Sequence, residues 1–197
     1  MALNRITRGG SVRRALLLAV VVAGLTGGLF ACGGGDGDSA VDKDADVGVL
    51  NEILARQLAA VEAYGEVLPA LRGAELATAR EFRSQEQEHV DATTKTLRGL
   101  DGESDPPAET IDLPELETPE DAWRFLYTLE SATIDAELNA VGRLTIGWPR
   151  PLIAAMAANQ AQRLVVIRRL LGARPSELIP EAFETGETDA PEEMMGE

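Results

Sequence analysis

The chain has 197 residues, of which 45% are hydrophobic, 26% are charged and only 4% are aromatic. This apolar fraction supports a packed domain and excludes disorder throughout the chain. The 33 acidic residues outnumber the 18 basic ones, for a net charge of −15, and nucleic acid is therefore excluded as an expected partner because its phosphates would be repelled. A single cysteine and a single histidine exclude an internal disulfide framework and sites that need several cysteines or two histidines.

Residues 1–31 have the features of an export signal peptide. They contain four arginines and no acidic residue, and an apolar run from Ala15 to Val22 leads into a stretch of small residues. This is the order of regions in a secretory signal. A transmembrane anchor is the alternative, although the apolar run is short and is followed closely by glycines. The pair Arg13-Arg14 leaves open whether export follows the general or the twin-arginine route.

The end of this signal resembles a bacterial lipobox, carried by Leu29-Phe30-Ala31-Cys32. The resemblance implies that Cys32 is lipidated, becomes the first residue of the mature chain and anchors it to the outer face of the cell membrane. The alternative is a free thiol in a cleaved signal. Residues 32–46 are rich in glycine and aspartate without apolar periodicity, which predicts a flexible lipoprotein tether.

Four segments with apolar residues at helical spacing follow the tether, which predicts an all-α domain over residues 47–184. Thr118 and Pro119 form a good helix start, and Gly172 lies where a helix cap belongs. The expected helices span about 48–72, 74–100, 119–145 and 150–171.

The connections between these helices predict the topology. Residues 101–118 contain three prolines and one glycine among many acidic residues, and the segment is too long for a tight hairpin. The three connections in chain order are therefore a short loop, a long crossover and a short loop. This is the layout of a four-helix bundle with one long crossover between its second and third helices. The acidic stretch over residues 185–197 is predicted to be a disordered tail.

Polar residues interrupt the apolar stripe of every predicted helix near its middle. Buried charges are unfavourable unless they are paired or bind a cation. Interruptions at similar heights in four helices therefore predict one shared polar layer, the alternative being that these side chains extend to the surface. They are Gln57 in the first helix, Glu86 and His89 in the second, Glu130 and Glu137 in the third, and Gln160 and Arg163 in the fourth.

This pattern resembles the ferritin-like superfamily, and in particular its exported bacterial ferritin-like domain proteins. That family holds two metals with a Glu on helices 1 and 3 and a Glu-x-x-His on helices 2 and 4. Glu86-Gln87-Glu88-His89 matches the first Glu-x-x-His, and Glu130 matches the Glu of helix 3. The segment over residues 179–184 also resembles the one that follows helix 4, and the similarity covers about residues 47–185.

The departures from the family pattern decide the expected chemistry. Gln57 stands where the family has its first Glu, and Gln160 and Arg163 stand where it has the second Glu and His. A different register would give Glu62 the helix 1 role, although its position points outward. Three of the six expected ligands are therefore missing, and Arg163 cannot bind a cation.

Two interpretations follow. In the first, Arg163 replaces the metals as the counter-charge of a buried ion-pair network, there is no cofactor, and the chain is a non-catalytic envelope module with no catalytic residue. In the second, Glu86, His89 and Glu130 hold iron or another divalent metal in an iron oxidase or metal sensor. The first is favoured because a guanidinium repels a nearby metal ion. A further alternative is an exported bundle whose acidic face binds a basic protein, although an acidic surface usually serves only solvation. The sequence identifies no particular protein partner.

Overall fold

The computed structural model describes residues 41–104 and 106–178. All of these residues belong to one compact unit. The predicted signal peptide, Cys32, most of the tether and the acidic tail lie outside the described residues, so those expectations remain predictions.

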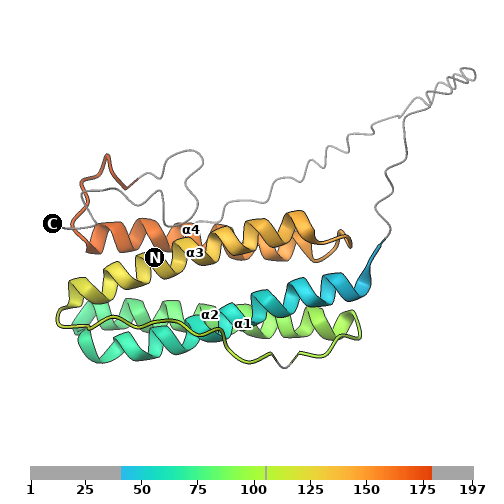
Figure 1. Ribbon diagram of the computed structural model, residues 1–197. Coiled ribbons are helices and arrows are strands. Elements are labelled where there is room, and N and C mark those ends of the chain that lie inside the picture. The colour runs from blue at the N-terminus through green and yellow to red at the C-terminus, as the bar shows by residue number, and fades with distance from the viewer. Residues whose placement is uncertain (1–40, 105, 179–197) are drawn as a thin grey trace, which may run out of the picture. The chain divides into compact units, whose positions relative to one another are not determined.

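The described part is an all-α bundle, which confirms the predicted fold class. One helix pair is α1 and α2, the other is α3 and α4, and α1 also packs against α3 (Figure 1). No helix among the described residues is long and apolar enough to cross a bilayer. The helices are α1 (Lys43–Val67), α2 (Gly73–Gly99), α3 (Pro119–Arg143) and α4 (Arg150–Leu170), with a 3-10 turn η1 (Leu68–Ala70) after α1.

The connection from α2 to α3 runs back along α1, as the predicted crossover requires (Figure 1). The Glu109 amide donates a hydrogen bond to the Ala55 carbonyl at 3.0 Å, and Arg56 pairs with the Glu109 carboxylate at 3.0 Å. The crossover returns the chain to the end at which α2 begins, and α3 therefore runs parallel to α2. A capping box of Thr118 and Asp121 starts α3.

The first helix begins and ends about five residues earlier than the sequence indicated. Its N-cap is Asp42, whose side chain accepts a hydrogen bond from the Ala45 amide at 3.0 Å. The acidic side chains of the first turn also interact favourably with the positive end of the helix dipole. Residues 43–46 therefore belong to the helix and not to the predicted tether. The helix gives way to η1 at Pro69, which has no amide hydrogen to continue the helical pattern.

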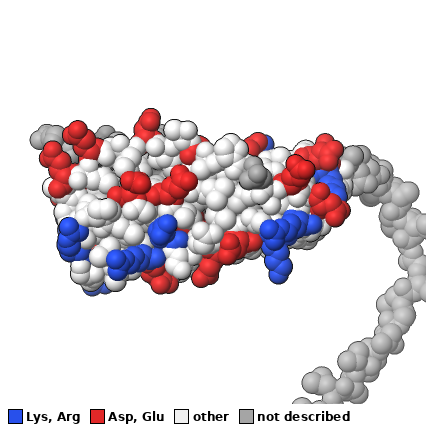
Figure 2. All heavy atoms as spheres, turned by 90° about the horizontal axis from the view of Figure 1, so that it is seen from below, with Lys and Arg blue, Asp and Glu red and all other residues white. Residues whose placement is uncertain are grey.

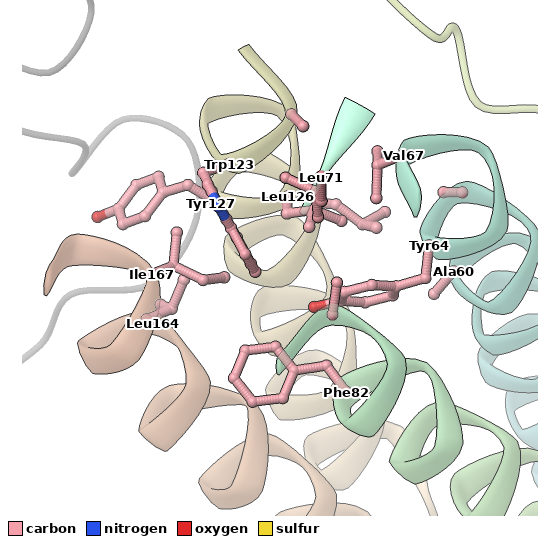
Figure 3. Close-up of a cluster of buried hydrophobic side chains, with 14 of the residues drawn as sticks. Ala60, Tyr64, Val67, Leu71, Phe82, Trp123, Leu126, Tyr127, Leu164 and Ile167 are labelled. Carbon is pink, nitrogen blue, oxygen red and sulfur yellow. The ribbon is translucent and has the colours of Figure 1, made fainter. Parts of the chain in front are cut away.

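The hydrophobic core consists of two clusters, one towards each end of the bundle. Tyr64, Phe82 and Trp123 belong to the first cluster (Figure 3), and Leu54 and Val90 belong to the second. Along the chain, polar positions fall between the two sets, as with Glu86 between Phe82 and Val90. The interior of the bundle is thus apolar at both ends and polar in its middle.

Candidate functional site: a buried polar centre

All four helices contribute polar side chains to the middle of the bundle. Each side chain in this set is no more than 2% exposed, Tyr64 included. We call the set the polar centre. Its members are Gln57 and Tyr64 from α1, Glu86 from α2, Glu130 and Glu137 from α3, and Gln160 and Arg163 from α4.

Arg163 makes the largest number of polar contacts in the polar centre. Its Nη1 donates hydrogen bonds to Oε1 of Glu86 and, at 3.0 Å, to Oε1 of Glu130. Its Nε donates to Oε1 of Gln85 at 3.1 Å, and its Nη2 donates to Oδ1 of Asn159 at 2.8 Å. Every nitrogen of the guanidinium therefore has an acceptor, and two of these acceptors are carboxylates from different helices.

Tyr64 joins the polar centre to the first hydrophobic cluster. Its hydroxyl donates a hydrogen bond to the same Oε1 of Glu130 that Arg163 contacts. The Tyr64 and Phe82 rings meet edge to face, with centroids 6.3 Å apart and planes at 84° (Figure 3). The Arg163 guanidinium lies over the Phe82 ring, 5.5 Å from its centroid, a distance at which a cation is attracted to a ring face. Burial and the charge of Glu130 raise the pKa of Tyr64 well above its usual value, so the phenol remains a donor.

Glu137 is bonded to amides rather than to the guanidinium. Nε2 of Gln57 and Nε2 of Gln160 each lie 3.5 Å from Oε1 of Glu137. The Gln160 amide also donates to Oε1 of Glu86 at 3.3 Å, and the Gln57 amide contacts Sδ of Met156 at 3.4 Å. The two glutamines therefore solvate the carboxyl group that lies outside the hydrogen-bonding reach of Arg163.

The three buried carboxyl groups differ in their tendency to ionise. Burial, with the Glu86 charge nearby, raises the pKa of Glu137 to about 9. Burial also raises the pKa of Glu130 to about 7, even though Arg163 opposes this change. Burial acts on Glu86 in the same direction, but the His89 ring and the Arg163 charge outweigh it and hold the Glu86 pKa below its usual value. At neutral pH, Glu137 is therefore protonated and Glu86 is the main counter-charge of Arg163.

The polar centre contains more acceptor atoms than donors. Protonation of Glu137 converts one acceptor oxygen into a donor, which agrees with its raised pKa. Five buried oxygens receive no hydrogen bond from the described residues: Oε1 of Gln57, Oε2 of Glu86, Oε2 of Glu130, Oε2 of Glu137 and Oε1 of Gln160.

The candidate metal ligands are only partly brought together. Nδ1 of His89 lies 3.6 Å from Oε1 of Glu86, longer than a hydrogen bond, and the His89 side chain is 12% exposed. Glu130 is joined to Glu86 through Arg163. Glu62, the alternative helix 1 ligand, is exposed. In residues 41–104 and 106–178, no three His, Cys, Asp or Glu side chains form a group that could hold a metal ion.

Sequence reasoning missed three residues that complete the polar centre. Tyr64 donates a hydrogen bond from its hydroxyl to Glu130. The available signal was its position seven residues after Gln57 on the same stripe. Gln85 and Asn159 bond Arg163 from outside the stripes, and no apolar pattern would have selected them.

Arg168 and the two tryptophans lie away from the polar centre. Arg168 is in the last turn of α4. It is only 3% exposed, and its Nη2 donates a hydrogen bond to the Tyr127 hydroxyl at 2.9 Å. Trp123 is a core residue at 1% exposure, whereas Trp148 lies in the turn between α3 and α4 and is 53% exposed.

The fold and the polar residues at its centre define a ferritin-like four-helix bundle. A family model for the ferritin-like domain matches residues 45–173, and the chain belongs to this family. No curated protein matches the chain.

Among the solved structures that share the fold, two match over nearly their whole length. A conserved hypothetical protein from Mycobacterium tuberculosis is 19% identical with a TM-score of 0.60, and the match covers 66% of this chain and 99% of that one. A structure described as ferritin-like, diiron-carboxylate proteins from Bacillus anthracis is 18% identical with a TM-score of 0.55, and covers 67% of this chain and 99% of that one.

The donor set of this chain does not fit the pair of metals that the ferritin-like fold implies. A paired site takes a Glu from two helices and a Glu-x-x-His from each of the other two. In the polar centre only α2 carries a Glu-x-x-His, and α1 and α4 contribute the amides of Gln57 and Gln160 and the guanidinium of Arg163. Amides supply no charge to balance a metal, and Arg163 adds a positive one, so no reaction step through paired metals follows from these residues.

Proposed function

We propose that this chain is a non-catalytic ferritin-like module of the cell envelope, tethered through lipidated Cys32 to the outer face of the membrane. In its polar centre, Arg163 takes the electrostatic role that metal ions have in catalytic relatives. The observation that supports this role is the pair of hydrogen bonds from one nitrogen, Nη1 of Arg163, to Oε1 of both Glu86 and Glu130.

The charge balance favours a guanidinium over a metal at this position. Although burial opposes its ionisation, Glu130 and Glu86 raise the pKa of Arg163 above its usual value, so the group remains charged. One Arg163 charge balances one Glu86 carboxylate, protonation neutralises Glu137, and Glu130, with its pKa raised to about 7, is only partly ionised at neutral pH. A divalent ion next to Arg163 would meet strong repulsion at short range, which metal binding would have to overcome.

Titration of the purified protein with ferrous iron tests the non-catalytic role. We expect no stoichiometric binding of two irons and no oxygen consumption above that of buffer. Tight binding of two irons per chain, accompanied by oxygen uptake, would overturn the proposal. A matched variant, Arg163→Lys, keeps the positive charge and is expected to behave in the same way.

Fatty-acid labelling of cells that express the full chain tests the tether. We expect the wild-type chain to incorporate label and to fractionate with membranes, and the Cys32→Ser variant to do neither. Labelling of both chains, or of neither, would contradict a lipid at Cys32.

The second candidate function is a residual metal-binding protein that uses Glu86, His89 and Glu130. It is favoured by one observation: Oε2 of Glu86, Oε2 of Glu130 and Nδ1 of His89 receive no hydrogen bond from the described residues. Elemental analysis of native protein separates the two candidates. Metal that is present in wild type and lost in His89→Ala would support this second function, and equal metal content in both would exclude it.

A further inference from the structure

One end of the bundle carries an exposed tryptophan in a fixed position. Trp148 is 53% exposed, yet one edge of its ring packs against Gly99 at the end of α2, where an added Cβ would lie 3.4 Å from the ring. Nε of Arg150 donates a hydrogen bond to the Leu144 carbonyl at 3.0 Å and closes the turn that carries Trp148. The ring is therefore held in place while much of it faces water.

The same turn is tied to the point where the chain enters the bundle. Asp46, in the first turn of α1, is fully buried, and its carboxylate accepts hydrogen bonds from the Thr145 and Ile146 amides, both at 2.7 Å. The Asp42 amide also donates to Oγ1 of Thr145 at 2.9 Å. The start of α1 and the turn between α3 and α4 lie at the same end of the bundle (Figure 1).

The chain between Cys32 and this end is short. Val41, which is 68% exposed, follows Cys32 by nine residues. An extended chain spans at most about 3.3–3.6 Å per residue, so a lipid on Cys32 would keep Val41 within about 30 Å of the bilayer surface. The opposite end, where α1 finishes and α2 begins, is separated from Val41 by the whole length of α1.

We propose that Trp148 docks this end of the bundle on the lipid headgroup region of the membrane that holds the tether. The inference rests on the lipid anchor of the proposed function. Tryptophan combines a large apolar ring with one polar N–H and is enriched at membrane–water interfaces for that reason. A ring held by Gly99 loses little further freedom on docking.

The charges at this end favour a zwitterionic headgroup. Lys43 pairs with Asp101 at 3.0 Å, and Arg143 pairs with Glu52. Asp46 is already committed to the α3–α4 turn. Arg98 and Arg150 are also exposed near Trp148, but the acidic residues Asp42, Asp44 and Asp101 lie at the same end of the bundle, where acidic and basic side chains are mixed (Figure 2). The acidic residues offset the basic ones and leave no positive excess for anionic lipids, so the contact depends on Trp148 itself.

The test uses the chain from Cys32 onward, which keeps all of the described residues and has a single cysteine. We couple Cys32 to a maleimide lipid in phosphatidylcholine vesicles, so docking is tested whether or not cells lipidate this cysteine. Tryptophan emission is then recorded with and without lipids brominated near the headgroup. Since the chain has two tryptophans, Trp148→Phe gives the signal of buried Trp123 for subtraction.

We expect the Trp148 emission to move to shorter wavelength on coupling and to lose most of its intensity to brominated lipid. A matched control, Cys32→Ser with Ala74→Cys, attaches the vesicle at the opposite end of the bundle, and there Trp148 should keep its emission in water. Docking is overturned if Trp148 stays water-exposed in the Cys32-coupled chain, or if both attachments change it equally. Failure of fatty-acid labelling in cells with docking intact would instead count against the lipoprotein anchor alone.

Discussion

Arg163 on α4 and Glu130 on α3 form an ion pair inside the bundle, with 3.0 Å between Nη1 and Oε1 and both side chains only 2% exposed. Glu86 on α2 contacts the same nitrogen. A buried charge of this kind is stabilised only while its partners are present, because removal of one leaves the other without compensation. The stability of the bundle is therefore coupled to the composition of its polar centre.

Replacement of Arg163 by an apolar residue should destabilise the protein strongly. In Arg163→Met, Glu86 loses its counter-charge in a site that is 1% exposed, and we expect a loss of about 3–5 kcal/mol in the free energy of unfolding at neutral pH. Urea unfolding followed by circular dichroism measures it. The control is Arg143→Met, which removes the exposed pair with Glu52 and should change stability little. Equal effects of the two substitutions would contradict the buried role of Arg163.

Stability should fall as the pH rises from about 5 to 9. Folded Glu137 has its pKa raised to about 9 from an ordinary value of 4.5, so in this window the folded state keeps a proton that the unfolded state has lost. Unfolding then releases a proton, and each such group lowers stability by up to about 1.4 kcal/mol per pH unit. Glu130, whose pKa is raised to about 7, adds to this loss of stability only up to about pH 7. Urea unfolding at a series of pH values measures the slope.

The variant Glu137→Gln should remove part of this pH dependence. An amide stays neutral at every pH, so above pH 7 we expect a nearly flat stability profile and a protein more stable than wild type at pH 9. The control Glu62→Gln changes an exposed carboxyl on α1 and should leave the wild-type slope unchanged. An unchanged slope in Glu137→Gln would show that Glu137 is ionised in the folded protein at neutral pH.

Restoring the family's ligands should create a metal site. The triple variant Gln57→Glu, Gln160→Glu and Arg163→His replaces two amides and a cation by ligand groups and gives the set that paired metals require. We expect this variant to bind divalent metal in isothermal titration while the wild type does not. The double variant Gln57→Glu with Gln160→Glu keeps Arg163 and so tests the effect of the guanidinium alone. It should bind metal much more weakly than the triple variant. Equal binding by the double and triple variants would show that Arg163 does not oppose metal.

Asp46 should hold the α3–α4 turn against α1. Asp46→Ala leaves the Thr145 and Ile146 amides without the acceptor they have at 2.7 Å, and we expect a loss of about 1–3 kcal/mol for the unsatisfied groups and faster hydrogen exchange at both amides. Asp44→Ala changes an exposed residue of the same helical turn and is the control. Unchanged exchange in Asp46→Ala would contradict this role.

The helices and the polar layer could be predicted from the sequence because both depend on periodicity. Glu86 and Glu137 occupy apolar positions of their stripes, and the structure buries both at 1% exposure or less. The start of α1 could not be predicted in this way. The acidic run at 42–46 suggested a tether, whereas Asp42 caps the helix and Asp46 bonds the distant Thr145.

The details of the polar centre depend on tertiary contacts that no local pattern records. Gln85 meets Arg163 from a neighbouring helix, and Tyr64 meets Glu130 across 66 residues of sequence. The different ionisation of Glu130 and Glu137 arises because only Glu130 reaches the guanidinium. Sequence reasoning could name these residues but could not distinguish their surroundings.

The central claim is that a guanidinium stands where related bundles keep metals. Diffraction from crystals soaked in ferrous iron, recorded on both sides of the iron absorption edge, tests it most directly. The expected result is no anomalous peak among Glu86, His89 and Glu130, with Nη1 of Arg163 bonded to both carboxylates. A strong peak bound by these carboxylates, with Arg163 turned out of the bundle, would contradict the account.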